Sequence, residues 1–266
     1  MIEDWRGQWA LVTGASAGIG KALATELAAG GTNLVLTARR EQRLEELARQ
    51  LSAEHDVLAE GFAADLAQPS APEEILAFTC QKGLHIDLLV NNAGFGNYGE
   101  FLQAKTQRLL DMVQVNCSAV VHLTRLFLPE MIERRRGDVL VVASTAAFQG
   151  VPYIATYAAT KGFDLLFAEG LAEEVKAYGI RVCALCPGST ESEFHEVAGH
   201  RPPSRVDRRE SAEKVARNGL RALAAGKSYV ISGRRNYLAA QSERLVPRRL
   251  VTRIAAKLFR PPGNEL

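Results

Sequence analysis

The chain has 266 residues, of which 47% are hydrophobic and 23% charged, and its formal net charge is +2. Such a chain can bury a substantial core without disulfides or a metal. The small net charge argues against nucleic-acid binding driven by phosphate neutralisation. The amino terminus lacks the apolar core of a signal peptide, and no apolar run approaches the ~20 residues that span a bilayer. These features predict a cytoplasmic protein that binds no nucleic acid.

Short apolar runs alternate with amphipathic segments along the chain. The runs that we expect to form buried strands are Trp9–Thr13, Asn33–Thr37, Leu88–Asn91, Val139–Ala143 and Arg181–Cys186. The segments with helical periodicity are Ile19–Ala29, Glu41–Glu54, Glu73–Lys82, Gln107–Glu133 and Thr156–Ala177. Strict alternation predicts an α/β fold, with a doubly wound, Rossmann-like parallel sheet between two helical layers. Because no linker or repeat interrupts it, we expect a single domain over residues 1–266.

No metal site is predicted. Cys183 and Cys186 are three residues apart in an expected strand, so their side chains point to opposite faces and are not expected to share a metal or a disulfide. His195 and His200 are five apart without a carboxylate companion, which favours plain surface histidines.

A glycine-rich turn, TGASAGIG at Thr13 to Gly20, joins the first expected strand to the first expected helix. Glycines let the backbone approach a pyrophosphate, which then lies at the helix N-terminus. Plain turn chemistry is the alternative, since the G-x-x-x-G-x-G spacing differs from the commoner fingerprint. The strand–loop–helix context favours dinucleotide binding. The expected contacts are Gly14, Ser16, Ala17, Gly18, Ile19 and Gly20.

The second expected strand leads into Arg39 and Arg40, where NAD-binding sheets carry an acidic residue for the ribose 2′-hydroxyl. A guanidinium instead favours a 2′-phosphate through charge-assisted bonds. The alternative is that both arginines are merely solvated at the strand end. NADP (NADPH) is therefore the predicted cofactor.

Three side chains are predicted to carry out the chemistry. Tyr157 and Lys161 are four apart in an expected helix and share one face, and Ser144 follows an expected strand at the sheet's carboxyl edge. A neighbouring ammonium, together with an oxidised nicotinamide, is expected to lower the pKa of the phenol from about 10. One hydroxyl then polarises a carbonyl and the other exchanges its proton.

These motifs resemble those of the short-chain dehydrogenase/reductase family. The matching stretches are TGASAGIG, NNAG at Asn91 to Gly94, Ser144, YAATK at Tyr157 to Lys161, and Pro187-Gly188, and they extend to about residue 195. The resemblance implies an NADP-dependent oxidoreductase that moves a hydride between the nicotinamide and a small-molecule carbonyl or alcohol, with Tyr157 as acid/base. It also implies a homodimer or homotetramer formed through Gln107–Glu133 and Thr156–Ala177.

Further site residues follow from the resemblance alone. Asp65 and Leu66 should touch the adenine, and Asn92, Ala93 and Gly94 should flank the adenosine ribose. Asn116 matches the position that orders a water leading from Lys161 to solvent. The remaining cofactor contacts are Tyr157, Lys161, Pro187, Gly188, Thr190 and Ser192. The family often carries Thr where this chain has Ser192, so Thr190 is an alternative donor to the carboxamide of the nicotinamide. In addition, Ala17 stands where some NADP-preferring members carry a basic residue.

The polar stretch from Gly188 to about residue 210 follows a strand's carboxyl end, so we interpret it as a substrate lid. Phe95, Phe148, Tyr153 and Phe194 follow the motif elements. They indicate a pocket for an apolar carbonyl compound, such as an acyl chain or ring ketone, or simply lid packing.

A basic amphipathic helix is expected over residues 247–260. Its apolar face contains Leu250, Val251, Ile254 and Leu258, and its basic face contains Arg249, Arg253, Lys257 and Arg260. Packing against its own domain or a partner subunit is favoured over peripheral contact with an anionic membrane, because the apolar face is narrow and lacks Trp.

Two other functions could use the same scaffold. A catalytically silent NADP-binding sensor or scaffold would be expected to lose Ser144, Tyr157 or Lys161, and all three are present. A lyase or epimerase on the same scaffold usually has a separate substrate domain, for which this chain has little room.

Overall fold

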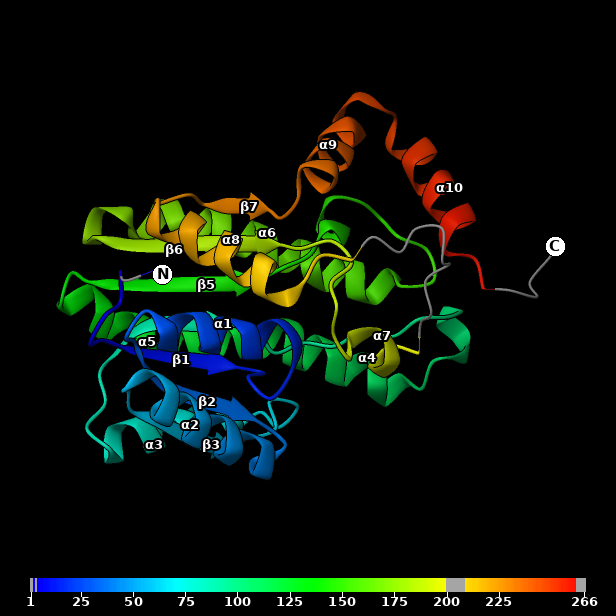
Figure 1. Ribbon diagram of the computed structural model, residues 1–266. Coiled ribbons are helices and arrows are strands. Elements are labelled where there is room, and N and C mark those ends of the chain that lie inside the picture. The colour runs from blue at the N-terminus through cyan, green and yellow to red at the C-terminus, as the bar shows by residue number, and fades with distance from the viewer. Residues whose placement is uncertain (1, 3, 200–208, 262–266) are drawn as a thin grey trace.

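A seven-stranded parallel sheet forms the centre of the computed structural model, which describes residues 2, 4–199 and 209–261 (Figure 1). The strand order is β3-β2-β1-β4-β5-β6-β7. Every pair of neighbours runs parallel, so the predicted doubly wound sheet is confirmed. The strands are β1 (Trp9–Thr13), β2 (Asn33–Ala38), β3 (Ala59–Ala63), β4 (Ile86–Asn91), β5 (Gly137–Val142), β6 (Ile180–Cys186) and β7 (Tyr229–Ile231).

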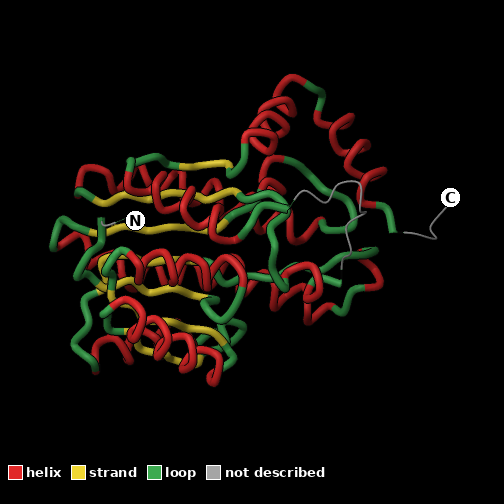
Figure 2. Tube along the Cα trace, in the orientation of Figure 1, coloured by secondary structure: helices red, strands yellow, loops and turns green. Residues whose placement is uncertain are grey.

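Helices cover both faces of the sheet, as the tube in Figure 2 shows. One layer contains α1 (Gly18–Ala29), α2 (Glu41–His55) and α8 (Ala212–Ala224), and the other contains α3 (Ala71–Gln81), α5 (Ala119–Glu133) and α6 (Ala155–Val175). Four further helices lie toward or beyond the carboxyl edge of the sheet (Figure 1): α4 (Thr106–Val113), α7 (Phe194–Val197), α9 (Arg234–Ser242) and α10 (Arg248–Phe259).

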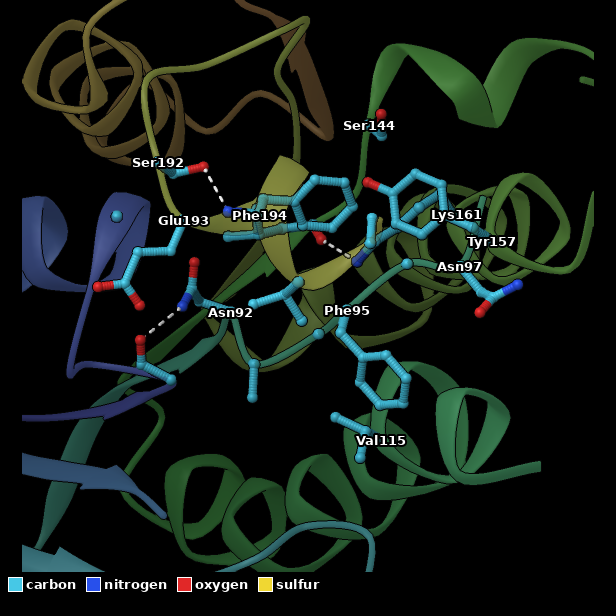
Figure 3. A pocket seen from close by; sticks show the side chains of 18 of the residues that line it. Asn92, Phe95, Asn97, Val115, Ser144, Tyr157, Lys161, Ser192, Glu193 and Phe194 are labelled. Carbon is cyan, nitrogen blue, oxygen red and sulfur yellow. Dashed lines mark hydrogen bonds between the residues drawn. The ribbon is translucent and has the colours of Figure 1, made fainter. Parts of the chain in front are cut away.

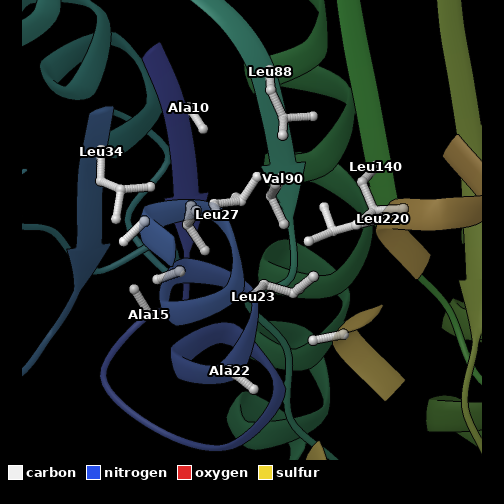
Figure 4. Packing of buried hydrophobic residues seen from close by; sticks show 14 of the residues in the cluster. Ala10, Ala15, Ala22, Leu23, Leu27, Leu34, Leu88, Val90, Leu140 and Leu220 are labelled. Atoms are coloured by element: carbon white, nitrogen blue, oxygen red, sulfur yellow. The ribbon is translucent and has the colours of Figure 1, made fainter. Parts of the chain in front are cut away.

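Burial on both faces explains why the strands show no alternation of apolar and polar residues. In β1, Ala10 and Val12 pack toward α1, while Leu11 packs into the opposite layer. Figure 4 shows Leu23 and Leu27 of α1 in the first of these layers. In β6, Cys183 belongs to one layer and Cys186 to the other. Both thiols are free and buried, as expected for residues three apart on a strand.

Several of the described elements were not predicted from the sequence, among them β3, β7, the short helix α7 in the lid, α8 and α9. The strand β3 has the sequence AEGFA, which is poor in β-branched residues and only partly buried at the sheet edge. The other edge strand, β7, has three residues, too few for a periodicity. The helices α8 and α9 follow the lid stretch, where no helix was predicted.

The predicted helix Gln107–Glu133 differs from the structure, in which it is divided into α4, a π-helical turn (Gln114–Ser118) and α5. A π-helical turn inserts one residue into the helical repeat and often lies at a functional site. Here it contains Asn116. Periodicity cannot reveal such a turn, because the apolar pattern continues on both sides of it.

The chain order places a cleft at the carboxyl edge of the sheet. From β1 the chain proceeds to β2 and β3 on one side and then returns to β4 on the other, so the connections after β1 and β4 diverge. The expected lid begins beside this cleft. Its two ends meet in a parallel bridge between Thr190 and Glu210, and the short helix α7 lies within it; residues 200–208, and with them His200, lie outside the described part.

Candidate active site

A cleft of about 1250 Å³ lies at this carboxyl edge. All the residues expected to contact the cofactor line it, as do Ser144, Tyr157 and Lys161. Asn116 does not. The volume exceeds that of a typical drug-sized pocket and suits a dinucleotide together with a substrate. The sequence motifs, which are spread over ~180 residues, therefore converge on one cavity (Figure 3).

The three glycines of the turn at one end of the cleft stand where a side chain would not fit. Gly14 and Gly18 have positive φ angles of +66° and +54°, a region that other residues rarely adopt. A Cβ on Gly20 would lie 2.3 Å from the Gly14 carbonyl oxygen. The helix α1 begins here without a side-chain cap, so its first amides are available to an anion. This cradle fits a pyrophosphate.

The NNAG segment braces the strand that leads into the turn. The Asn92 side-chain amide donates to the carbonyl oxygen of Thr13 at 2.8 Å and to that of Gly14 at 3.3 Å. In return, the Thr13 hydroxyl accepts from the backbone amides of Asn92 and Ala93, each at 2.9 Å. These bonds fix β1 to the end of β4. The position of the glycine turn is therefore set by the neighbouring strand as well as by its own backbone.

The two arginines after β2 have different surroundings. Arg40 donates to the Ser16 hydroxyl at 3.1 Å and pairs with Glu193 at 2.8 Å. Arg43 pairs with the same carboxylate at 2.8 Å, and these two arginines lower the pKa of Glu193. Arg39 is exposed and lines the cleft. Because a lid carboxylate already binds Arg40, the geometry favours Arg39 as the guanidinium directed to a 2′-phosphate.

Lys161 is held in place by two contacts below Tyr157. Its ammonium donates to the Val142 carbonyl oxygen at 2.7 Å and to the Asp164 carboxylate at 2.9 Å. It lies 6.0 Å from the centre of the Tyr157 ring. The Ser144 hydroxyl accepts from the Ala146 amide at 3.1 Å, which holds it at the end of β5. The three groups thus meet at one end of the cleft (Figure 3).

Burial raises the pKa of the Tyr157 phenol above its ordinary value. The Lys161 ammonium and the Ser144 hydroxyl act in the opposite direction, but the loss of solvation outweighs them. The sequence led us to expect a lower pKa from the ammonium and an oxidised nicotinamide together. Among the protein's own groups, burial decides the direction, and the neutral phenol is the favoured form.

Asp164 is a member of the site that sequence reasoning missed. It is 1% exposed, and one oxygen of its carboxylate has no hydrogen-bond partner among the described residues. Burial alone would lower the pKa of Lys161, but the adjacent Asp164 carboxylate raises it overall, so the ammonium stays charged. The signal was available, because residues three apart on a helix are neighbours.

Asn116 lies next to the site, in the π-helical turn. Its side-chain carbonyl accepts from the Phe95 amide, and its side-chain NH₂ donates to the Phe95 carbonyl and to the Thr160 hydroxyl. Both amide hydrogens are thus used within the protein. The geometry ties the loop after β4 to the helix that carries Lys161, and the water-ordering role remains a prediction.

Aromatic side chains line the cleft close to Tyr157, together with polar residues such as Glu100 and Asp111. Phe95 and Phe194 line it, and the rings of Phe194 and Tyr157 are 5.1 Å apart. Phe148 and Tyr153 do not line it; Phe148 packs against Tyr229 instead. The last residue of α10, Phe259, also lines the cleft, a contribution that the sequence did not predict.

The resemblance offers two hydroxyls, those of Thr190 and Ser192, as donors to the carboxamide of a nicotinamide. Their contacts in the structure differ. Thr190 is buried and its hydroxyl donates to the Gly188 carbonyl oxygen at 3.0 Å. Ser192 accepts from the Phe194 amide at 3.3 Å and lines the cleft, so its own proton remains available. This geometry favours Ser192.

Arg108 of α4 anchors the described part of the lid. Its guanidinium donates to the Asn97 side chain at 3.0 Å, to the Gly96 carbonyl at 3.1 Å and to the Val197 carbonyl. Together with the pairing of Glu193 to Arg40, this holds α7 over the cleft from both sides. Neither contact was predicted, because the partners are far apart in the sequence.

The comparison with known proteins agrees with this geometry. Residues 8–202 match the model of the short chain dehydrogenase family. A very-long-chain 3-oxoacyl-CoA reductase of Bos taurus is 35% identical over 190 residues, which cover 70% of this chain and 60% of the relative. One of Phaeosphaeria nodorum is 35% identical over 181 residues, covering 66% and 53%. The chain thus spans only about half to two thirds of the length of these relatives.

Solved structures show the same fold. A short-chain dehydrogenase of Sphingobium yanoikuyae in complex with NADPH superposes with a TM-score of 0.81 at 26% identity, covering 97% of this chain and 98% of that one. The L-sorbose reductase of Gluconobacter frateurii, complexed with NADPH and L-sorbose, gives a TM-score of 0.77 at 28% identity, covering 88% and 98%.

These relatives contradict the cytoplasmic location predicted from the sequence. The very-long-chain 3-oxoacyl-CoA reductases are enzymes of a membrane, so composition and the lack of a long apolar run were insufficient grounds for that prediction. Among the described helices, none has the length and apolar character needed to cross a bilayer.

The strand order, the glycine cradle and the family match over residues 8–202 lead to one conclusion. This chain belongs to the short-chain dehydrogenase/reductase family of oxidoreductases.

Proposed function

We propose that the protein is an NADPH-dependent reductase of 3-oxoacyl thioesters with long acyl chains. The observation that carries this proposal is the convergence of Ser144, Tyr157 and Lys161 with an apolar wall at one end of the cleft. The names of the curated relatives support the substrate class, and the NADPH-bound neighbours support the cofactor.

The protein's own groups have distinct roles in the proposed reaction. The hydroxyls of Ser144 and Tyr157 donate hydrogen bonds to the carbonyl oxygen of the substrate, which polarises it. Bound NADPH supplies the hydride. Tyr157 gives its proton to the oxygen, and the Lys161 ammonium stabilises the phenolate that remains. Asp164 and the Val142 carbonyl keep the ammonium in position.

The cleft offers a matching set of groups for the cofactor. The glycine turn and the first amides of α1 would hold the pyrophosphate, and Asp65 and Leu66 would flank the adenine. Gly94 would keep the space beside Lys161 open, because a Cβ there would lie 3.5 Å from the Lys161 ammonium. Ser192 would donate to the carboxamide.

A substrate series tests the proposal. We expect NADPH oxidation to accelerate with acyl length in a series of 3-oxoacyl-CoA thioesters, with kcat/KM rising about fourfold per methylene that enters the apolar part of the cleft. L-Sorbose is the polar comparison. A higher kcat/KM for L-sorbose than for every thioester would disprove the apolar substrate class.

Cofactor preference tests the role of Arg39. Replacement of Arg39 by Ala is expected to raise the KM for NADPH about tenfold or more, since a charge-assisted bond to the 2′-phosphate is lost. The KM for NADH should stay unchanged. Arg40→Ala is the matched control, with a smaller effect because Arg40 binds Ser16 and Glu193. An equal rise in the KM for NADPH and the KM for NADH would refute the assignment of Arg39 to the 2′-phosphate.

Self-association is a second part of the proposal. Exposed apolar side chains cover the outer faces of the helices expected to form subunit contacts: Leu110, Val113, Val121, Phe163 and Leu166. Such residues suit a subunit interface. Light scattering after gel filtration should give the mass of a dimer or tetramer, and Leu166→Glu should shift it to that of a monomer. A monomeric parent protein would contradict this prediction.

A further inference from the structure

The helix α10 uses only one side to pack against the rest of the domain. Ala255, which is buried, forms a small cluster with Val151 and Ala158, and Phe259 packs against the same cluster. The Tyr98 hydroxyl donates to the Phe259 carbonyl oxygen at 2.9 Å. These contacts fix the orientation of α10, which projects with α9 beyond the carboxyl edge of the sheet (Figure 1). The remaining side of the helix faces outward.

The outward side of α10 carries an apolar row. Leu250, Ile254 and Leu258 are spaced four apart, so they lie above one another on the helix. Their exposed fractions are 48%, 50% and 62%. Packing against the domain buries Ala255 and part of Phe259 but leaves about half of each of these three side chains exposed to solvent, at a cost in free energy.

A row of cations lies directly beside the apolar row. Arg249, Arg253 and Lys257 have the same four-residue spacing, each one position before a member of the apolar row, and all three are exposed. The sequence from Arg244 to Arg260 contains no acidic residue. We define these six residues, Leu250, Ile254, Leu258, Arg249, Arg253 and Lys257, as the outer face of α10.

We propose that the outer face of α10 binds the surface of a membrane that contains anionic phospholipids. Apolar side chains would enter the acyl boundary while the adjacent cations contact the phosphate groups, the arrangement of an interfacial amphipathic helix. A second copy of the chain suits this face poorly. A symmetric contact would bring two rows of cations together without a carboxylate on either helix.

The position of the helix connects membrane binding with the cleft. Phe259, at the end of α10, both packs on the domain and lines the cleft. A membrane bound to the outer face would therefore lie near the apolar end of the site. Long acyl substrates partition into membranes, so this placement would bring the site close to them. The link to the substrate rests on the proposed function, whereas lipid binding itself does not.

Co-sedimentation of the full chain with vesicles tests the proposal without any substrate. We expect binding to phosphatidylcholine vesicles that contain phosphatidylserine, and weak binding to phosphatidylcholine alone. Arg253→Gln/Lys257→Gln should weaken partitioning about 30-fold, as expected for two cations near an anionic surface. Leu250→Asn/Ile254→Asn should weaken it about tenfold through loss of the apolar contact.

Matched variants separate this face from general effects. Arg49→Glu, on the exposed side of α2, changes the net charge by the same amount as the double glutamine variant. Leu58→Asn alters an apolar residue that is 64% exposed and lies before β3. Neither should change vesicle binding. Binding lost equally in Arg49→Glu, or absent from phosphatidylserine vesicles at low salt, would overturn the proposal.

Two further measurements keep the interpretation clear. NADPH oxidation with a short, soluble 3-oxoacyl thioester should be the same in the α10 variants as in the parent protein. If the parent protein binds vesicles but shows no turnover of this thioester, the proposed function is refuted and the membrane proposal is not affected. A decrease in molecular mass for Leu250→Asn/Ile254→Asn in light scattering would identify a second copy as the occupant and overturn the membrane assignment.

Discussion

Replacement of Tyr157 by Phe is expected to lower kcat for carbonyl reduction by between about 100-fold and 10,000-fold, the range for loss of a positioned proton donor. The ring should still pack against Phe194, at 5.1 Å in the parent protein, so the change removes the proton and leaves the wall intact. NADPH binding, followed by fluorescence, should be unaltered. Full activity in Tyr157→Phe would refute the proposed mechanism.

The direction of the Tyr157 pKa shift also predicts opposite pH dependences for the two directions of the reaction. Since burial raises this pKa above its ordinary value of about 10, the phenol keeps its proton throughout the neutral range. Reduction, which uses the protonated form, should be level there and decrease only at strongly alkaline pH. Alcohol oxidation, which uses the phenolate, should increase steadily with pH. A reduction rate that already decreases as the pH is raised toward 8, because Tyr157 loses its proton there, would contradict this prediction.

The second large effect is expected for Asp164→Asn. This substitution removes the negative partner of a buried ammonium, since the Lys161 and Asp164 side chains are almost inaccessible to solvent and 2.9 Å apart. Breaking such a pair is expected to lower the free energy of unfolding by about 3 kcal/mol or more. A displaced Lys161 should also reduce kcat about 100-fold. Urea unfolding and steady-state kinetics measure the two effects.

The pH profile distinguishes a role in the site from a merely structural one. Asp164 raises the pKa of Lys161 against the effect of burial. Without it, the effect of burial is opposed less strongly and the pKa of Lys161 falls, so the activity of Asp164→Asn should decline at lower pH than that of the parent protein. The parent protein, which has the carboxylate, should therefore stay active to higher pH than the variant. A purely structural defect would lower the activity without changing its dependence on pH.

Asp138→Asn is the matched control for this experiment. Asp138 is also a buried carboxylate, bonded to Arg181 at 2.6 Å and to the Trp5 indole at 2.7 Å. It lies at the start of β5, at the opposite edge of the sheet from the cleft. Its substitution should cost a comparable free energy of unfolding without moving the pH profile. An equal shift of this decline to lower pH in both variants would show that the effect is not specific to Lys161.

The sequence by itself determined the fold class and identified many of the residues that line the cleft. Alternating apolar runs and amphipathic segments specify a parallel sheet between helices, because strands buried on both faces need apolar residues at every position. The glycine turn and the Tyr157–Lys161 spacing are local patterns, set by backbone sterics and by the helical repeat. Such features depend on few residues close together in the chain, so they can be recognised without a structure.

The edge strands β3 and β7 show where local patterns are insufficient. The sequence AEGFA has little strand propensity of its own, and it becomes a strand because β2 offers it unpaired backbone groups. The composition-based prediction of a cytoplasmic location failed for a related reason. Association with a membrane depends on which side chains the fold leaves exposed, and amino-acid counts do not contain that information.

Only the tertiary structure decided which distant groups meet. Glu193 pairs with Arg40 across 153 positions, and Phe259 reaches the cleft that begins at Gly14. Whether Asp164 is buried, and therefore strongly coupled to Lys161, depends on the packing of α6 against the sheet. The same packing decides which side of α10 faces outward. Each of these outcomes depends on burial in three dimensions. Burial sets the solvation of a charge and the accessible area of an apolar side chain. No single stretch of the sequence encodes either quantity.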